Sequence, residues 1–80
     1  MAEHVYAVRC TWDPDAEIWI AESDDVPGLA TGVDTLDALV DKLKMVIPEL
    51  LEANDLLSSD SEDIPFVVVG ERQERAPRAA

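Results

Sequence analysis

The stretch DTLDALVDKLKMVIPELLEAN, residues 34–54, carries the strongest structural signal in this sequence. Its apolar residues recur at steps of three and four, the period of an α-helix with one apolar face. They are Leu36, Leu39, Val40, Leu43, Val46, Ile47, Leu50 and Leu51. Asp34 or Thr35 is expected to cap the first turn. Pro48 interrupts the pattern, so the sequence predicts either a kink near residues 44–48 or a second short helix with Pro48 in its first turn.

Two strands joined as a hairpin are expected before this helix. HVYAVRCTW, residues 4–12, alternates along the chain, and its even-numbered side is expected to face the core. DPDAE, residues 13–17, begins with an Asp-Pro pair that suits a type I turn. EIWIAES, residues 17–23, then resumes the strand pattern.

The second strand of the hairpin is apolar on both sides. Ile18 and Ile20 point one way, whereas Trp19 and Ala21 point the other way. We therefore expect cover on both faces of the sheet, one face by the helix and the other by a partner subunit. The alternative is an indole that lies exposed on the sheet without a function.

Two shorter segments complete the predicted fold. PGLATGV, residues 27–33, predicts a corner and a short strand in which Gly32 takes a bulge or a positive φ. IPFVVVG, residues 64–70, predicts a buried strand with Pro65 at its start or on its solvent side. Between them, NDLLSSDSED at 54–63 predicts the helix end at Asn54 and an acidic loop.

The predicted order is therefore β-β-β-α-β, an α+β domain over residues 1–70. We expect a small, mainly antiparallel sheet with one long helix on one face. If the last strand pairs beside the first, the helix is the crossover between them. Residues 71–80 lack periodicity and are expected to form a disordered tail.

The charge is strongly negative and uneven. The chain has 18 acidic and six basic residues, a net charge of −12. Residues 1–63 hold sixteen of these acids and only three bases, whereas Arg72, Arg75 and Arg78 lie in the tail. Such a body disfavours nucleic acid and anionic membranes, and it favours a basic protein partner. The alternative is that the acidity only keeps the protein soluble.

Candidate chemistry is sparse. His4 and Cys10 are the only histidine and cysteine, so one chain cannot assemble a disulfide or a Cys/His metal site. The acids of Asp13–Glu17 lack the glycine of a calcium loop, and the Asp24–Asp25 pair lacks a third ligand. We therefore expect no catalytic residue, metal or cofactor. The absence of a signal peptide and the lone thiol favour a soluble, cytoplasmic protein.

Residues 12–54 resemble the HicB-like antitoxin superfamily, most closely its short stand-alone branch of unknown function. The most specific pieces are Trp19 and Ala21, Pro27-Gly28-Leu29, Asp34-Thr35-Leu36 and Ile47-Pro48-Glu49-Leu50-Leu51. The resemblance covers about residues 4–70 and implies a curtailed RNase-H-like fold without the metal-binding carboxylates of the nuclease. For antitoxin members, it implies direct neutralisation of HicA, a small basic toxin RNase.

Two features depart from typical HicB antitoxins, and the first of them points to the stand-alone branch. Val33 separates Gly32 from Asp34, whereas typical members place the glycine directly before the Asp-Thr pair. Only 23 residues follow Leu57, so we expect no operator-binding domain of the kind that typical HicB antitoxins carry.

The sequence thus predicts a binding protein of a toxin–antitoxin kind that contacts a small basic protein. Trp19, Glu22, Asp24 and Asp25 are its candidate contact residues. The alternative is a stand-alone structural or regulatory module whose main association is with itself, as a dimer or higher oligomer through the second sheet face or an edge strand. An enzyme such as a metal nuclease is the least favoured class.

Overall fold

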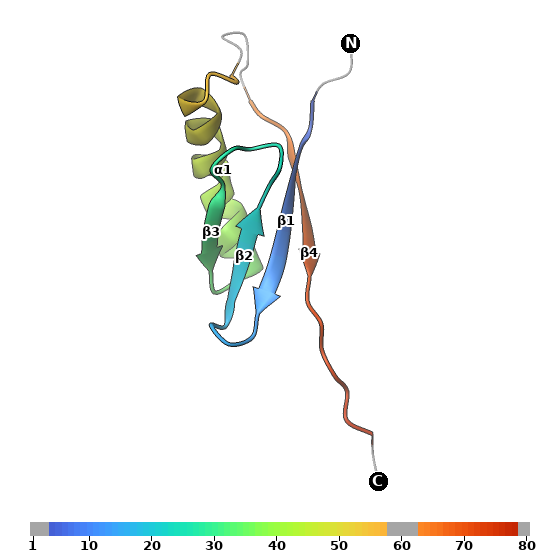
Figure 1. Ribbon diagram of the computed structural model, residues 1–80. Coiled ribbons are helices and arrows are strands. Elements are labelled where there is room, and N and C mark those ends of the chain that lie inside the picture. Colours follow the sequence, from blue (N-terminus) through green and yellow to red (C-terminus); the bar gives the residue numbers. More distant parts are fainter. Residues whose placement is uncertain (1–3, 58–62, 79–80) are drawn as a thin grey trace.

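The computed structural model describes residues 4–57 and 63–78 and has the order β-β-β-α-β (Figure 1). Its elements are β1 (Tyr6–Asp13), β2 (Ile18–Glu22), β3 (Ala30–Val33), α1 (Leu36–Ala53) and β4 (Phe66–Glu71). This confirms the predicted α+β arrangement. Half of the acidic loop expected at 54–63, and the last two residues of the expected tail, lie outside the described residues.

The four strands form one sheet in the order β3-β2-β1-β4. β2 pairs antiparallel with both β1 and β3, whereas β4 pairs parallel with β1. Parallel neighbours need a crossover, and α1 lies in the chain between β3 and β4. The last strand therefore lies beside the first, and the sheet is antiparallel in two of its three pairings.

The helix begins at a polar cap and runs through the proline. The Thr35 side chain accepts a hydrogen bond from the Ala38 amide at 3.1 Å, so Thr35 is the cap and Asp34 is not. At the other end, the Asn54 side-chain amide donates to the Leu50 carbonyl at 2.8 Å. α1 is one helix from Leu36 to Ala53 with Pro48 inside it. The expectation of a second helix at Pro48 is therefore wrong.

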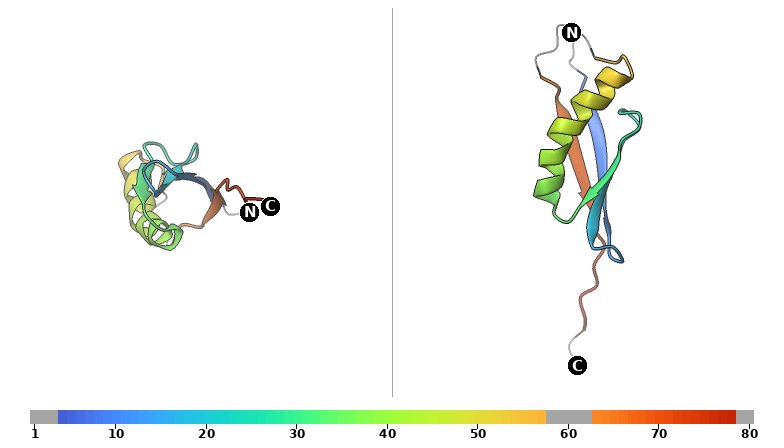
Figure 2. Two further views of the ribbon diagram at one scale, coloured as in Figure 1. Left: turned by 90° about the horizontal axis from the view of Figure 1, so that it is seen from below. Right: turned by 90° about the vertical axis from the view of Figure 1, so that its left-hand side faces the viewer.

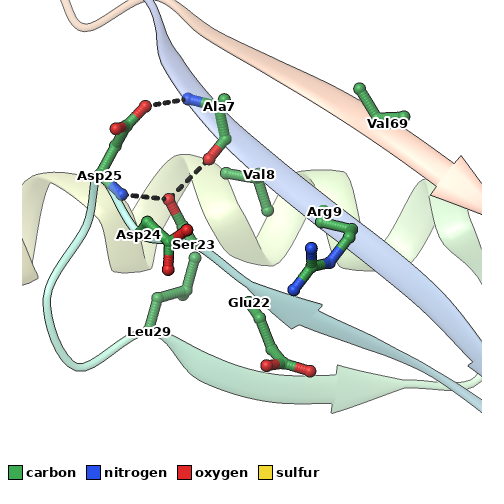
Figure 3. Close-up of a pocket in the computed structure, with 9 residues that line it drawn as sticks. All are labelled: Ala7, Val8, Arg9, Glu22, Ser23, Asp24, Asp25, Leu29 and Val69. Atoms are coloured by element: carbon green, nitrogen blue, oxygen red, sulfur yellow. Dashed lines mark hydrogen bonds between the residues drawn. The ribbon is translucent and has the colours of Figure 1, made fainter.

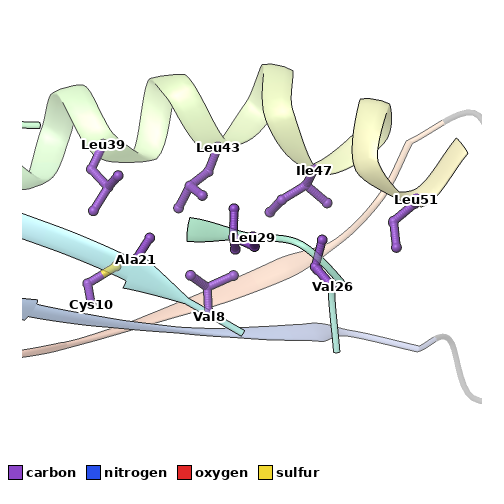
Figure 4. Close-up of a cluster of buried hydrophobic side chains, with 9 residues drawn as sticks. All are labelled: Val8, Cys10, Ala21, Val26, Leu29, Leu39, Leu43, Ile47 and Leu51. Atoms are coloured by element: carbon purple, nitrogen blue, oxygen red, sulfur yellow. The ribbon is translucent and has the colours of Figure 1, made fainter. Parts of the chain in front are cut away.

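One face of α1 packs on the sheet and forms the core (Figure 4). Leu39, Leu43, Ile47 and Leu51 are fully buried, which continues the apolar stripe on both sides of Pro48. This continuous packing explains why the helix tolerates the proline, which costs it one backbone hydrogen bond. The residues opposite the helix are Val8, Cys10, Ala21, Val26 and Leu29. The expected core side of β1 is confirmed at Val8 and Cys10.

Of the two glycines around β3, Gly28 lies in the predicted corner, whereas Gly32 has another role than the sequence predicts. Gly32 pairs in register with Ile20, without a bulge, and it has no positive φ. A Cβ at Gly32 would lie 2.9 Å from Ile18 Cδ1, so this glycine makes room for the isoleucine. The positive φ, +83°, belongs to Gly28 in the corner before β3. The expectation of a bulge or a positive φ at Gly32 is therefore wrong. The glycine is needed because the side chain of Ile18 lies over it.

Candidate interaction surface

The side of the sheet opposite α1, here called the open face, carries apolar side chains. Because Val8 and Cys10 point to α1, the alternation of the strands turns Ala7 and Arg9 to the other side. The pairing places further residues on this open face: Ile18, Ile20 and Glu22 from β2, and Val67 and Val69 from β4. Val67 is 44% exposed and Val69 is 59% exposed. No helix of the described part of the chain covers this face (Figure 2).

An acidic segment, residues 22–25, begins at the last residue of β2 and borders the open face (Figure 3). The Ser23 hydroxyl donates to the Ala7 carbonyl at 2.6 Å, and it accepts from the amides of Asp25 and Val26 at 3.1 and 3.2 Å. Asp25 Oδ2 accepts from the Ala7 amide at 2.8 Å. These bonds tie the segment to β1, so Asp25 has a structural role, whereas Asp24 is exposed.

A shallow groove of about 440 Å³ lies between this segment and the open face (Figure 3). Val69 and Ala7 supply apolar surface, while Glu22 and Asp24 supply negative charge. Arg9 is directly opposite Glu22 in the strand register, so one cation lies among the acids. The groove therefore offers an apolar floor with a mainly negative border, an arrangement that suits protein binding.

The structure brings together three of the four residues that the sequence suggested as partner contacts. Glu22, Asp24 and Asp25 all line the groove. Trp19 lies on the opposite side of the sheet, partly buried against the core, with its ring over Gly70. The indole is therefore separated from the three acids by the sheet itself.

Sequence reasoning missed three residues of this surface, namely Arg9, Val67 and Val69. The run FVVVG predicts a strand buried on both sides, because it has no polar residue to mark an exposed side. Strand alternation was nevertheless a usable signal, since only one side of an edge strand can face a single helix.

A second hollow, of about 570 Å³, lies where the described tail leaves the sheet. Arg72 stacks on the Trp12 ring, with its guanidinium carbon 4.1 Å from the ring centroid. Its Nε donates to Glu74 Oε1 at 2.6 Å. These contacts hold the first residues after β4 against β1.

The described residues hold few metal-ligating or nucleophilic side chains outside the acids. No group of three or more His, Cys, Asp or Glu side chains in residues 4–57 and 63–78 is arranged to hold a metal ion. Cys10 is fully buried in the core, and burial raises the pKa of its thiol, which disfavours the reactive thiolate. The same described residues include no helix with the length and hydropathy of a membrane span.

Comparison with known proteins places the chain in a wider group. Residues 5–79 match the model of a family described as a domain of unknown function, DUF1902. The chain is also similar to a hypothetical protein from the extremely thermophilic bacterium Thermus thermophilus, whose crystal structure it matches with 39% sequence identity and a TM-score of 0.70. That match covers 94% of this chain and 100% of the other. No curated protein matches the chain.

Proposed function

We propose a binding function for this chain, which belongs to the DUF1902 family of domains of unknown function. The chain acts as an antitoxin-like module that binds, and thereby neutralises, a small basic protein such as a HicA-type toxin RNase. The resemblance of residues 12–54 to HicB-like antitoxins names the class of partner. The single observation that supports the proposal best is the acidic segment 22–25 beside the apolar open face.

The chemistry of this surface suits such a partner. Val67 and Val69 provide apolar area that water solvates poorly, and Glu22 and Asp24 provide negative charge at its border. Opposite charges on two proteins raise their association rate and disfavour wrong partners. A net charge of −12 extends this attraction over the whole molecule.

In this role the protein acts in the cytoplasm, as part of a toxin–antitoxin system of the bacterial type. A lone, buried thiol is typical of a reducing compartment. The proposed role requires no catalytic group of this chain, because occupation of the toxin surface is sufficient for neutralisation.

The experiment is binding to the product of a neighbouring small basic reading frame. The two purified proteins are expected to form a stable complex whose affinity falls as the salt concentration rises. The double variant Glu22→Gln/Asp24→Asn should slow association several-fold and flatten the salt dependence. Asp25 is left unchanged, because its carboxylate accepts the Ala7 amide.

The matched control is Glu49→Gln/Glu52→Gln, which removes the same charge from exposed positions on α1. This control should retain most of the association rate. The proposal is refuted if no complex forms, or if both double variants weaken it equally, because the latter means that only total charge matters.

A second candidate function is self-association as a structural or regulatory module. The observation that favours it is the exposed edge of β4, where Val67 and Val69 lie at the border of the sheet. This candidate needs no other protein.

A further inference from the structure

One edge of the sheet has no paired strand within residues 4–57 and 63–78. β4 is the last strand in the order β3-β2-β1-β4, and no described segment pairs with its outer side. The Tyr6 amide donates to the Pro65 carbonyl at 3.1 Å, so Pro65 turns its backbone oxygen to β1. Backbone groups alternate along a strand, and Phe66, Val68 and Gly70 therefore turn their amides and carbonyls outward.

This edge lacks the features that usually protect one. Natural edge strands are short, or they carry lysine, proline or a bulge that blocks pairing. The other edge strand, β3, has only four residues, whereas β4 has six, FVVVGE, with no lysine and no proline. Val67 and Val69 are exposed apolar side chains, and the one charged residue of the strand, Glu71, is its last. These features are typical of a strand that pairs on both of its sides.

The segment after β4 continues this edge. Residues 72–78 run on beyond the end of the β1–β2 hairpin, away from α1, and all of them are exposed (Figure 1). Residues 63–78 hold three arginines and three acidic residues, so the edge region has no net charge in a chain of net charge −12. A second copy can approach this edge with less electrostatic repulsion than it meets elsewhere.

We propose that the outer edge of β4 binds β4 of a second copy of this chain, antiparallel, about a two-fold axis at Val69. A two-fold axis perpendicular to the sheet requires that facing residues lie on the same side. In this register Val69 faces Val69 of the other copy, and the outward groups of Val68 meet those of Gly70. The two sheets become one continuous sheet with both helices on the same side.

The register also matches the charges. Asp63 and Arg75 flank β4, and extension of the pairing over these flanking residues places Arg75 of one copy opposite Asp63 of the other. The two-fold axis makes this pair twice. Opposite charges in facing positions stabilise strand pairing, and both side chains are exposed before association. Shifting the axis to Val68 or Gly70 removes this pair. This self-complementarity favours a second copy over an unrelated strand.

The first test is sedimentation of the purified chain alone, which separates this inference from the binding of a basic protein. The wild type is expected to sediment at twice the 8.8 kDa mass of one chain. Val69→Lys places two like charges face to face and should raise the dimer dissociation constant about tenfold or more. Met45→Lys adds the same charge on α1, at a side chain that is 69% exposed, and should leave the dimer unchanged.

The second test addresses the register. Arg75→Asp and Asp63→Arg should each weaken the dimer, and the double variant should restore it. Val69→Cys should give a disulfide-linked dimer on mild oxidation, since facing residues on the axis lie within reach of a disulfide, whereas the buried Cys10 should not react.

A strictly monomeric wild type overturns the proposal. It is also overturned if Val69→Lys and Met45→Lys change the dimer dissociation constant equally. If Val69→Lys fails to fold by circular dichroism, the cysteine variant decides instead. Absence of the cross-link, together with no rescue by the charge exchange, then overturns the pairing at Val69.

Discussion

Truncation of Leu43 to alanine should remove a large part of the stability of this domain. Leu43 is fully buried at the middle of the α1 stripe, between Leu39 and Ile47. Removal of a buried leucine side chain costs about 2–5 kcal/mol, which combines lost transfer free energy with the cavity left behind. We expect about 3 kcal/mol, because three methylene equivalents alone account for about 2.4 kcal/mol. An 80-residue domain has a total stability of about 4–12 kcal/mol.

The assay is urea unfolding followed by helical circular dichroism, at one fixed protein concentration so that association contributes equally. The same loss should lower the melting temperature by about 12–24 °C. Met45→Ala, two residues away on the exposed side of the helix, is the control and should stay within about 0.5 kcal/mol of the wild type. A Leu43→Ala variant that loses less than about 1 kcal/mol would refute the packing of α1 on the sheet.

Three further changes test other parts of the structure. Thr35→Ala removes the helix cap and should lower the free energy of unfolding by about 1 kcal/mol, measured by urea titration, whereas Asp34→Ala should not. Gly28→Ala should lower the free energy of unfolding by about 1–2 kcal/mol in the same assay, because alanine is strained at the positive φ of this position. Steric overlap adds nothing, since the new Cβ would lie an ordinary 3.6 Å from Leu50. The raised pKa of Cys10 means that the folded state holds its proton more tightly than the unfolded state does. Its contribution to stability is therefore complete below the ordinary thiol pKa of 9.0 and is lost as the pH rises through the higher folded value. Cys10→Ala should remove this alkaline decline from the pH profile of unfolding.

The elements of the fold were predictable because each has its own local pattern. The period of Leu39, Leu43 and Ile47 defines the helix, and the alternation around Val8 and Cys10 defines the core side of β1. The sequence predicts the pairing of β4 with β1 only as one possibility, because pairing between strands at the two ends of the chain leaves no local pattern. One of the two alternatives at Pro48 is wrong, because tertiary packing on both sides keeps the helix whole.

The candidate surface was predictable only in part. Glu22, Asp24 and Asp25 are close in the sequence, so their proximity in space follows from the chain itself. The sequence groups Trp19 with them because the second strand is apolar on both sides, but Trp19 lies on the helix side of the sheet. Arg9 joins the surface through the β1–β2 hairpin, opposite Glu22. Val69 joins it only through the pairing of β1 with β4, which is a long-range contact.

That long-range contact also bears on how the protein folds. Tyr6 pairs with Phe66, so 60 residues separate two partners in a chain of 80. Contacts between distant residues slow folding, because the entropy of closing the intervening loop is lost before the contact is gained. The β1–β2 hairpin and α1 are local and can form early, whereas the parallel pairing of β1 with β4 should form late. Substitutions in β4 should therefore accelerate unfolding more than they slow folding.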